Sequence, residues 1–430
     1  MKYDQINASL FVKNRKKFVK EMAPKSLAVF NSNDVYPISA DSTMAFQQHR
    51  DIFYLSGVDQ EESILVLFPG AIDEKNREIL FLKETSDLIA IWEGAKLSKQ
   101  EAFDVSGIKT VYWLSEFDVV FKTLMSEAES IYFNTNEHLR ANTIVQTRED
   151  RFIIDCKQKY PAHNSRKSAP ILHHIRSVKE KEELDLMQHA CNITEKGLRR
   201  VLSFVRPGVY EYEIEAEIMH EFLRNKSKGF AYGPILASGA GSCVLHYVEN
   251  NKQCLDGDII LMDFAAEYAN YASDLTRSIP VNGKYSPRQK AVYNAVLNVK
   301  KKAEKLLVPG TIMAEYQTEV GLYMQDELLQ LGLIDKTDIK NQNPNWPAYK
   351  TYFMHGTSHF IGLDTHDVGI WNEPIKAGMV FTCEPGIYIP KEKLGIRIED
   401  NLVIQEKGEP FNLMRNIPIE VEEIESLMKK

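Results

Sequence analysis

The order of predicted elements repeats in the second half of this chain, and this repeat constrains the fold more than any other feature. Apolar residues at helical spacing predict two helices, and two short strand-like runs follow them. The same order then returns once. In each copy a Pro-Gly pair, which ends a helix, stands between the two helices. The predicted elements are helices at 184–198, 214–222, 291–307 and 313–331, and strands at 258–262, 268–275, 379–382 and 396–399. The repeat predicts a pseudo-twofold domain whose two halves contribute to one cavity.

The segment before this repeat indicates where the domain begins. Residues 155–170 are polar and end at Ser-Ala-Pro, which is typical of a linker. Ser177 and Glu180 fit a capping box, in which two side chains bind free backbone N–H groups at the start of a helix. We therefore expect an N-terminal domain of residues 1–170 and a C-terminal domain of residues 171–430.

The N-terminal domain has the pattern of an α/β fold. Short runs rich in branched and aromatic residues are typical of buried strands, and a helical pattern at 5–22 precedes them. The predicted strands are 26–30, 51–55, 63–68, 78–82 and 131–133. Strands and helices in this order predict a mixed sheet with covered faces.

The composition excludes two classes of function. The chain has 52 basic and 60 acidic residues, a formal charge of −8, and no basic stripe, which argues against nucleic-acid binding. The densest basic run, Lys300 to Lys302, is interpreted as a solvated helix face. No apolar stretch approaches the roughly 20 residues that span a bilayer, and the N-terminus lacks a signal-peptide core. We expect a cytoplasmic protein without a membrane partner.

The cysteines indicate no disulfide framework. They are odd in number, scattered and without a CxxC pair, which is typical of reduced thiols buried as small apolar residues. The five are Cys156, Cys191, Cys243, Cys254 and Cys383. Cys383 stands beside a candidate catalytic residue, but we interpret it as a packed strand residue.

Acidic residues stand in or directly after the strands of both copies of the repeat. Asp263 and Asp274 flank a predicted turn at 267–270 in the first copy, so their carboxylates could converge on one face of a hairpin. In the second copy Glu384 and Glu399 lie on adjacent predicted strands. Three histidines stand between the two pairs, in the segment MHGTSHFIGLDTHDVG. They are His355, His359 and His366.

Each of these residues taken alone has a structural interpretation, and their combination favours a metal site. A single acidic strand residue usually faces solvent, and a single histidine is more often a satisfied structural residue than a ligand. Asp263, however, follows Ile-Ile-Leu-Met and Glu384 follows Val-Phe-Thr-Cys. A lone carboxylate buried there costs several kcal/mol unless a cation compensates it. Four acids and an imidazole suit hard or borderline divalent cations, and a metal pair can activate water for hydrolysis.

Several segments resemble the pita-bread metallopeptidases, the family of aminopeptidase P, prolidase, methionine aminopeptidase and creatinase. They are DFAAEYANYASDLTR, HGTSHFIGLDTHDVG, EPGIYIP and GIRIEDNLVI. The N-terminal segments SADSTMAFQQHRDIFYLSGV and SDLIAIWEGAKLS resemble the N-domain of aminopeptidase P. Methionine aminopeptidase lacks such a domain, and creatinase does not keep the metal ligands. The resemblance therefore implies an Xaa-Pro aminopeptidase, which removes the N-terminal residue of peptides with proline at position two.

The resemblance also implies a role for each candidate ligand. Asp263 would chelate one metal, and Asp274 and Glu399 would bridge the pair. His359 and Glu384 would complete the shell of the other metal. Glu384 would in addition carry a proton from the nucleophilic water to the leaving nitrogen, which its place beside the metals allows. The implied cofactors are two divalent ions per subunit, with Mn²⁺ the metal that the family suggests.

Further positions match residues on the substrate side of the family's site. His246 matches a substrate-side histidine, and His355 and His366 match those that line the proline pocket and stabilise the tetrahedral intermediate. Tyr388 is expected to contact substrate. Trp92 matches a residue that reaches a neighbouring subunit's site, which implies a homodimer or homotetramer. Local packing is the alternative interpretation of Trp92.

Arg397 has two possible partners. It lies two residues before Glu399 on a predicted strand, so both side chains should point into one cavity. Asp41 matches an N-domain aspartate of the family and is a candidate partner, with Tyr388 as a third member of the relay. The alternative is that Arg397 pairs with a metal-bound carboxylate and that Asp41 caps a loop.

Two other functions stay open. Prolidase shares the fold, the ligands and the chemistry but prefers Xaa-Pro dipeptides. A non-catalytic pita-bread binding module would typically have lost metal ligands, whereas all five are present here. The Pro-rich, aromatic segment at 341–352 matches no part of the family pattern and could shape the entrance to the site.

Overall fold

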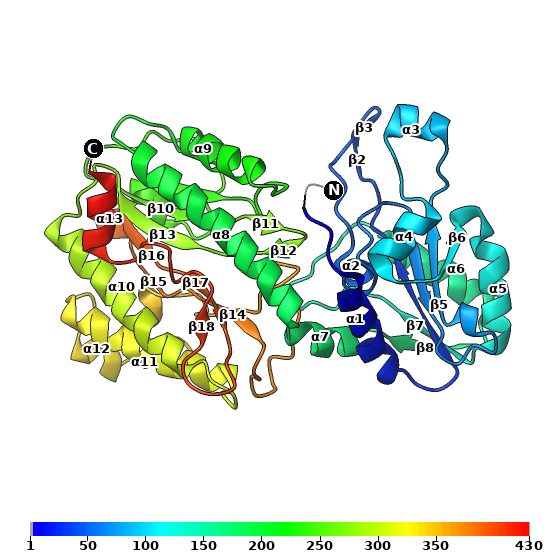
Figure 1. The fold of residues 1–430 in the computed structure, drawn as a ribbon. Helices are drawn as coiled ribbons and strands as arrows, with labels where there is room; N and C mark the ends of the chain where they lie inside the picture. The colour runs from blue at the N-terminus through cyan, green and yellow to red at the C-terminus, as the bar shows by residue number, and fades with distance from the viewer. Residues whose placement is uncertain (1–2, 430) are drawn as a thin grey trace. The chain divides into compact units, whose positions relative to one another are not determined.

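The computed structural model describes residues 3–429, which form two compact units (Figure 1). One unit comprises residues 3–175 and the other residues 176–429. The expected domain boundary between residues 170 and 171 falls inside helix α7 (Ala169–Ser177). No helix among the described residues has the length and apolar character needed to cross a membrane.

A six-stranded mixed sheet forms the centre of the N-terminal unit. Its order is β6-β5-β4-β1-β7-β8, with antiparallel pairing of β4 to β1 and β5 and parallel pairing elsewhere. The strands are β1 (Ser26–Asn31), β4 (Ile64–Leu67), β5 (Glu78–Leu82), β6 (Thr110–Trp113), β7 (Ser130–Phe133) and β8 (Asn164–Lys167), with a separate hairpin of β2 (Pro37–Ser39) and β3 (Ser42–Thr43). The helices are α1 (Ala8–Lys20), α2 (Arg50–Ser56), α3 (Asp87–Glu93), α4 (Lys99–Ser106), α5 (Phe117–Glu127) and α6 (Arg148–Lys159).

Helices cover both faces of this sheet. Leu27 and Val29 of β1 belong to a buried cluster that includes Leu124 of α5 and Ile153 of α6. Phe30 points to the opposite face, where its ring meets Phe18 of α1 edge-on at 5.3 Å. The predicted α/β fold with a mixed, covered sheet is confirmed for this unit.

Two predictions for the N-terminal unit are wrong. Residues 51–55, predicted as a strand, lie in helix α2, which His49 caps at its start and Gly57, with φ +71°, ends. A short apolar run suits a fully buried helix as well as a strand, so periodicity could not separate them. Residues 155–170 are not a linker, because they hold the end of α6, strand β8 and the start of α7. All four residues of β8 are exposed, as an edge strand allows, so its sequence is polar.

The C-terminal unit shows the predicted order of two helices and two strands twice, but the second strands begin at residues 276 and 400, directly after the predicted runs 268–275 and 396–399. Helices α8 and α9 precede β10 and β13, and helices α10 and α11 precede β14 and β17; both helix pairs are seen in Figure 1. The helices are α8 (Lys181–Phe204), α9 (Glu211–Arg224), α10 (Pro287–Leu306), α11 (Met313–Gln330), α12 (Lys336–Lys340) and α13 (Val421–Met428). The strands are β9 (Ile235–Ser238), β10 (Ile259–Asp263), β11 (Glu267–Tyr268), β12 (Tyr271–Ala272), β13 (Thr276–Pro280), β14 (Val380–Cys383), β15 (Gly386–Ile389), β16 (Leu394–Arg397), β17 (Asp400–Val403) and β18 (Phe411–Asn412).

The structure corrects two further details of the C-terminal unit. Helix α8 begins at Lys181, and its capping box is Glu180 with Glu183, because Ser177 is still the last residue of α7. Lys300 does not lie on a solvated helix face. It is 1% exposed, and its Nζ lies 2.7 Å from Asp400 Oδ2. A buried acid opposite the helix explains why this lysine points inward.

A backbone bridge between Thr276 and Glu399 joins the two halves of the repeat. The sheet β13-β10-β9 belongs to the first half and β14-β17-β18 to the second. The amide of Glu399 donates to the carbonyl of Thr276 over 3.1 Å, and the hydroxyl of Thr276 donates to Glu399 Oε2 over 2.7 Å. Acidic residues from both halves therefore lie around one point.

Candidate metal centre

Four of the five predicted ligands lie at or close to the ends of strands in the C-terminal unit. Asp263 ends β10, Asp274 lies between β12 and β13, and Glu399 lies between β16 and β17. Glu384 directly follows β14. His359 precedes β14 and is fixed to it, because its carbonyl accepts from the amide of Thr382 over 3.0 Å. Strand ends leave these side chains free of the ladder, so they can converge.

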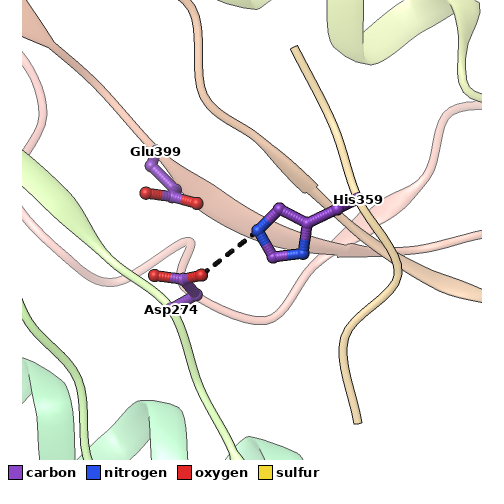
Figure 2. A group of neighbouring side chains, drawn as sticks. All are labelled: Asp274, His359 and Glu399. Carbon is purple, nitrogen blue, oxygen red and sulfur yellow. Dashed lines mark ion pairs between the residues drawn. The ribbon is translucent and has the colours of Figure 1, made fainter. Parts of the chain in front are cut away.

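Asp274, His359 and Glu399 form the tightest group, and all three are buried (Figure 2). One ligand atom from each lies within 4.8 Å of the others. His359 Nε2 lies 3.4 Å from Asp274 Oδ2 and 3.6 Å from Glu384 Oε1. An imidazole nitrogen therefore faces two carboxylates that come from different halves of the repeat.

Two details of this group fit a bound cation. His359 Nδ1 lies 2.9 Å from the carbonyl of Phe360, which can only accept, so Nδ1 carries a proton and Nε2 is free to be a ligand. Glu399 Oε1 is buried and has no hydrogen-bond partner within the described residues. A buried carboxylate oxygen without a donor is costly, and a metal ion would satisfy it. The donor set therefore fits divalent metal ions.

The ionisation of these acids supports the same conclusion. Burial, together with the charge of neighbouring Asp274, raises the pKa of Glu399 well above its usual value. Burial raises the pKa of Glu384 to about 7 and also raises that of Asp263. Burial lowers the pKa of His359, but the hydrogen bond to Asp274 and the charge of Glu384 raise it overall. Burial is the main cause of each raised pKa, and a cation among these acids would favour their charged forms.

Tyr232 belongs to this site and was missed by the sequence analysis. Its hydroxyl lies 2.6 Å from Asp263 Oδ1 and 2.6 Å from Asp274 Oδ1, so it can donate to either carboxylate. Burial and the two acids raise the pKa of Tyr232 well above 10, so the hydroxyl keeps its proton. The residue stands in the loop before β9, and no spacing marks one tyrosine among 19.

Arg397 pairs with Asp263, one of the candidate metal ligands, as the second of its two interpretations predicted. Its Nη2 lies 2.5 Å from Asp263 Oδ2, and its Nη1 donates to the Tyr388 hydroxyl over 2.9 Å. Its Nε donates to the hydroxyl of Thr276, which in turn donates to Glu399. Asp41 belongs to the other unit, and its pairing with Arg397 stays a prediction.

The structure brings two of the three substrate-side histidines into contact with the cluster. His355 Nε2 lies 2.8 Å from the Tyr388 hydroxyl, and its Nδ1 lies 4.0 Å from Glu384 Oε2. Burial and the charge of Arg397 lower the pKa of His355 to about 3, so this ring is neutral at pH 7. The His366 ring lies 4.5 Å from that of His359, centroid to centroid. His246 is exposed.

Comparison with known proteins assigns the chain to a family. Residues 185–406 match the family described as "Metallopeptidase family M24", and residues 11–132 match "Aminopeptidase P, N-terminal domain". The Xaa-Pro aminopeptidase of Escherichia coli strain K12 is 34% identical over 99% of this chain and 98% of its own length. The chain belongs to metallopeptidase family M24. The predicted family resemblance is thereby confirmed, and so is the predicted fold of both units.

Solved structures of M24 relatives match this chain along its whole length. Aminopeptidase PepP from Pseudomonas aeruginosa is 30% identical, covers 99% of this chain and 98% of its own, and has a TM-score of 0.89. A zinc-substituted aminopeptidase P from E. coli in complex with product is 33% identical, covers 99% of each chain and has a TM-score of 0.87. Among the sequence relatives, human Xaa-Pro aminopeptidase 3 is 29% identical, and the match covers 92% of this chain and 79% of the length of the human protein.

Proposed function

We propose that this chain is an Xaa-Pro aminopeptidase, a metallopeptidase that hydrolyses the bond between an N-terminal residue and a following proline. The observation that carries this proposal is the convergence of Asp274, His359 and Glu399 from both halves of the repeat. The full-length relatives named Xaa-Pro aminopeptidase support the choice of bond. The substrates are peptides with proline at position two.

Two divalent metal ions fit the site. Asp263, Asp274, His359, Glu384 and Glu399 would hold them, and Mn²⁺ is the ion we propose. Bound there, such ions would polarise the scissile carbonyl and make water nucleophilic at neutral pH. The remaining chemistry belongs to side chains of the chain itself.

Glu384 is the proposed proton carrier. It directly follows β14 and lies beside the other candidate ligands, where a carboxylate can take a proton from water and give it to the leaving nitrogen. His355 is neutral and brings no charge to the site; its Nδ1 lies 2.8 Å from the carbonyl of Gly356 and its Nε2 lies 2.8 Å from the Tyr388 hydroxyl. We propose that His246, His355 and His366, with Tyr388, bind the substrate. Arg397 holds Tyr388 and Asp263 in place.

The test compares four peptides on the metal-loaded enzyme. Proline's nitrogen carries no hydrogen and its ring needs an apolar slot, so a site built for Xaa-Pro should reject alanine at position two. We expect kcat/KM for Ala-Pro-Ala to exceed that for Ala-Ala-Ala at least tenfold. Equal cleavage of the two contradicts proline selectivity. Faster hydrolysis of Ala-Pro than of Ala-Pro-Ala indicates a prolidase instead, and Ala-Ala serves as the dipeptide control.

We further propose that the chain works as a homodimer or homotetramer in the cytoplasm. Helix α3 supports self-association, because Leu88, Ile91 and Trp92 are 65%, 76% and 82% exposed. Such a row of large apolar side chains is typical of a protein interface. Trp92 is the proposed inter-subunit residue and Asp41 the proposed partner of Arg397. Cell fractionation tests the location.

A further inference from the structure

Asn401 is a buried amide that holds the backbone of one candidate ligand. It lies on β17, is 0% exposed, and its Nδ2 donates to the carbonyl of Asp274 over 2.8 Å. Its Oδ1 accepts from the amide of the same residue over 3.0 Å. Asp274 lies between β12 and β13, outside both strands. The side chain of Asn401 therefore supplies both hydrogen bonds that a neighbouring strand would otherwise provide.

The orientation of this amide is determined by its surroundings. A backbone N–H can only donate and a carbonyl can only accept, so Oδ1 faces the former and Nδ2 the latter. Cys191 of α8 reinforces the arrangement, because its Sγ lies 3.6 Å from Asn401 Oδ1. The Asn401 side chain therefore binds both the N–H and the carbonyl of Asp274, and these two hydrogen bonds fix the position and the direction of the Asp274 backbone.

Buried ion pairs hold the start of β17, the strand that carries Asn401. Asp400 Oδ1 lies 2.6 Å from Arg277 Nη2, and Asp400 Oδ2 lies 2.7 Å from Lys300 Nζ. Arg277 Nη1 also donates to the carbonyl of Glu399 over 2.7 Å. All these groups are buried. Glu399 and the start of β17 are thus fixed to β13 and α10, and the side chain of Asn401 connects this fixed segment to Asp274.

Asp274 and Glu399 are both buried, and each offers a carboxylate oxygen within 4.8 Å of the other's, so their negative charges repel one another. A backbone free to move would let the two side chains separate before a cation arrives. We propose that Asn401 is a positioning residue that holds Asp274 against Glu399 so that the pair binds divalent metal. This inference rests on the proposed metal-dependent function.

The test measures Mn²⁺ affinity by calorimetry on chelator-treated protein, for the parent and for Asn401→Ala. Loss of a group that orients a metal ligand typically weakens metal binding 10–100-fold. We expect the dissociation constant for Mn²⁺ to rise at least tenfold. The matched control is Gln48→Ala in the N-terminal unit, where Gln48 is 1% exposed and its Nε2 donates to the carbonyls of Val58 and Gln60. This control should lose unfolding free energy but keep its Mn²⁺ affinity.

The outcomes separate the inference from the proposed function. A folded Asn401→Ala protein that binds Mn²⁺ within twofold of the parent overturns the inference alone. So does an equal loss of affinity in Gln48→Ala. A parent that binds no divalent metal overturns the proposed function and the inference with it. Where circular dichroism shows Asn401→Ala unfolded, Asn401→Ser carries the test. A serine side chain adds no charge and has one hydroxyl in place of the amide that holds both the N–H and the carbonyl of Asp274, so the same rise is expected.

Discussion

Glu384 differs from the other acids of the site because the proposed chemistry uses its proton. Glu384→Gln keeps the shape of the side chain but removes the proton acceptor, so kcat should fall at least about 100-fold. The control is Glu392→Gln, which removes the exposed partner of Arg288. Steady-state kinetics on enzyme with verified metal content measures the effect. Turnover near that of the parent would exclude a proton-carrying role.

Tyr232 places one hydroxyl between two carboxylates. Tyr232→Phe leaves Asp263 and Asp274 without this donor, and hydrogen bonds to charged groups contribute about 1.5–3 kcal/mol. We expect the unfolding free energy of the metal-free protein to fall by about that amount in urea titrations. Tyr36→Phe, at a tyrosine that is 39% exposed, should change it little. Equal stabilities for the two variants would show that the hydroxyl does not hold the acids together.

At the scale of elements, β16 lies directly against the 3-10 turn at Gly239–Cys243, three residues before His246. A Cβ built on Gly395 would lie 2.0 Å from the carbonyl oxygen of Ser242, so one of the two segments must shift. Gly395→Ala should destabilise the protein by about 1–3 kcal/mol, as overpacking does. It should also raise KM, because the loop that carries His246 moves.

The matched control for that prediction is Gly70→Ala. The nearest atom to a Cβ at Gly70 is 3.7 Å away, and its backbone is not in the left-handed region, so little change is expected. Urea unfolding and peptide kinetics on both variants provide the measurement. A Gly395→Ala enzyme with the parent's stability and KM would mean that β16 and the turn can separate without consequence.

At the scale of the whole molecule, the buried acids link metal binding to stability and pH. In the metal-free protein the raised pKa values of Glu384 and Glu399 mean that the folded state keeps protons which the unfolded chain releases above about pH 4.5. The free energy of unfolding therefore falls as the pH rises from about 4.5 through 7. Each of these two carboxyl groups contributes a fall of at most about 1.4 kcal/mol per pH unit.

Denaturant titrations of chelated protein between pH 5 and 8 measure this loss. Glu384→Gln should reduce the slope, since it removes one of the titrating groups. Added Mn²⁺ should stabilise the protein more as the pH rises, because the ligands bind metal only when deprotonated. If the unfolding free energy of the metal-free protein increases between pH 5 and 8, these carboxyl groups do not control the pH dependence of stability.

Self-association is the other property of the whole molecule. A chain of 49.3 kDa should be found at two or four times that mass by light scattering at micromolar concentration. Replacing Leu88, Ile91 and Trp92 by serine should shift the mass toward that of one chain, because it removes the exposed apolar row of α3. Serine at Ile72, which is 85% exposed elsewhere in the unit, is the control. A parent that is already monomeric would refute the proposed oligomer.

The sequence by itself determined the repeat, the fold class and the set of acids and histidines at the site. The helical spacing of apolar residues over several turns predicts long helices such as α8 and α10. Asp263 and Glu384 were recognisable because each directly follows a buried apolar strand, where a carboxylate needs a cation. These signals are local, so one strand or one helix is enough to carry them.

Only the tertiary structure decided which residues hold the acids and histidines of the site in place. Tyr232 and Asn401 reach Asp274 from 42 and 127 residues away, and Lys300 is buried by an acid 100 residues distant. No local pattern marks such a contact, because it joins segments that only the tertiary fold brings together. The short run at 51–55 became a helix for the same kind of reason. Its apolar residues permit either structure, and the capping residues His49 and Gly57, together with packing against α1, select the helix.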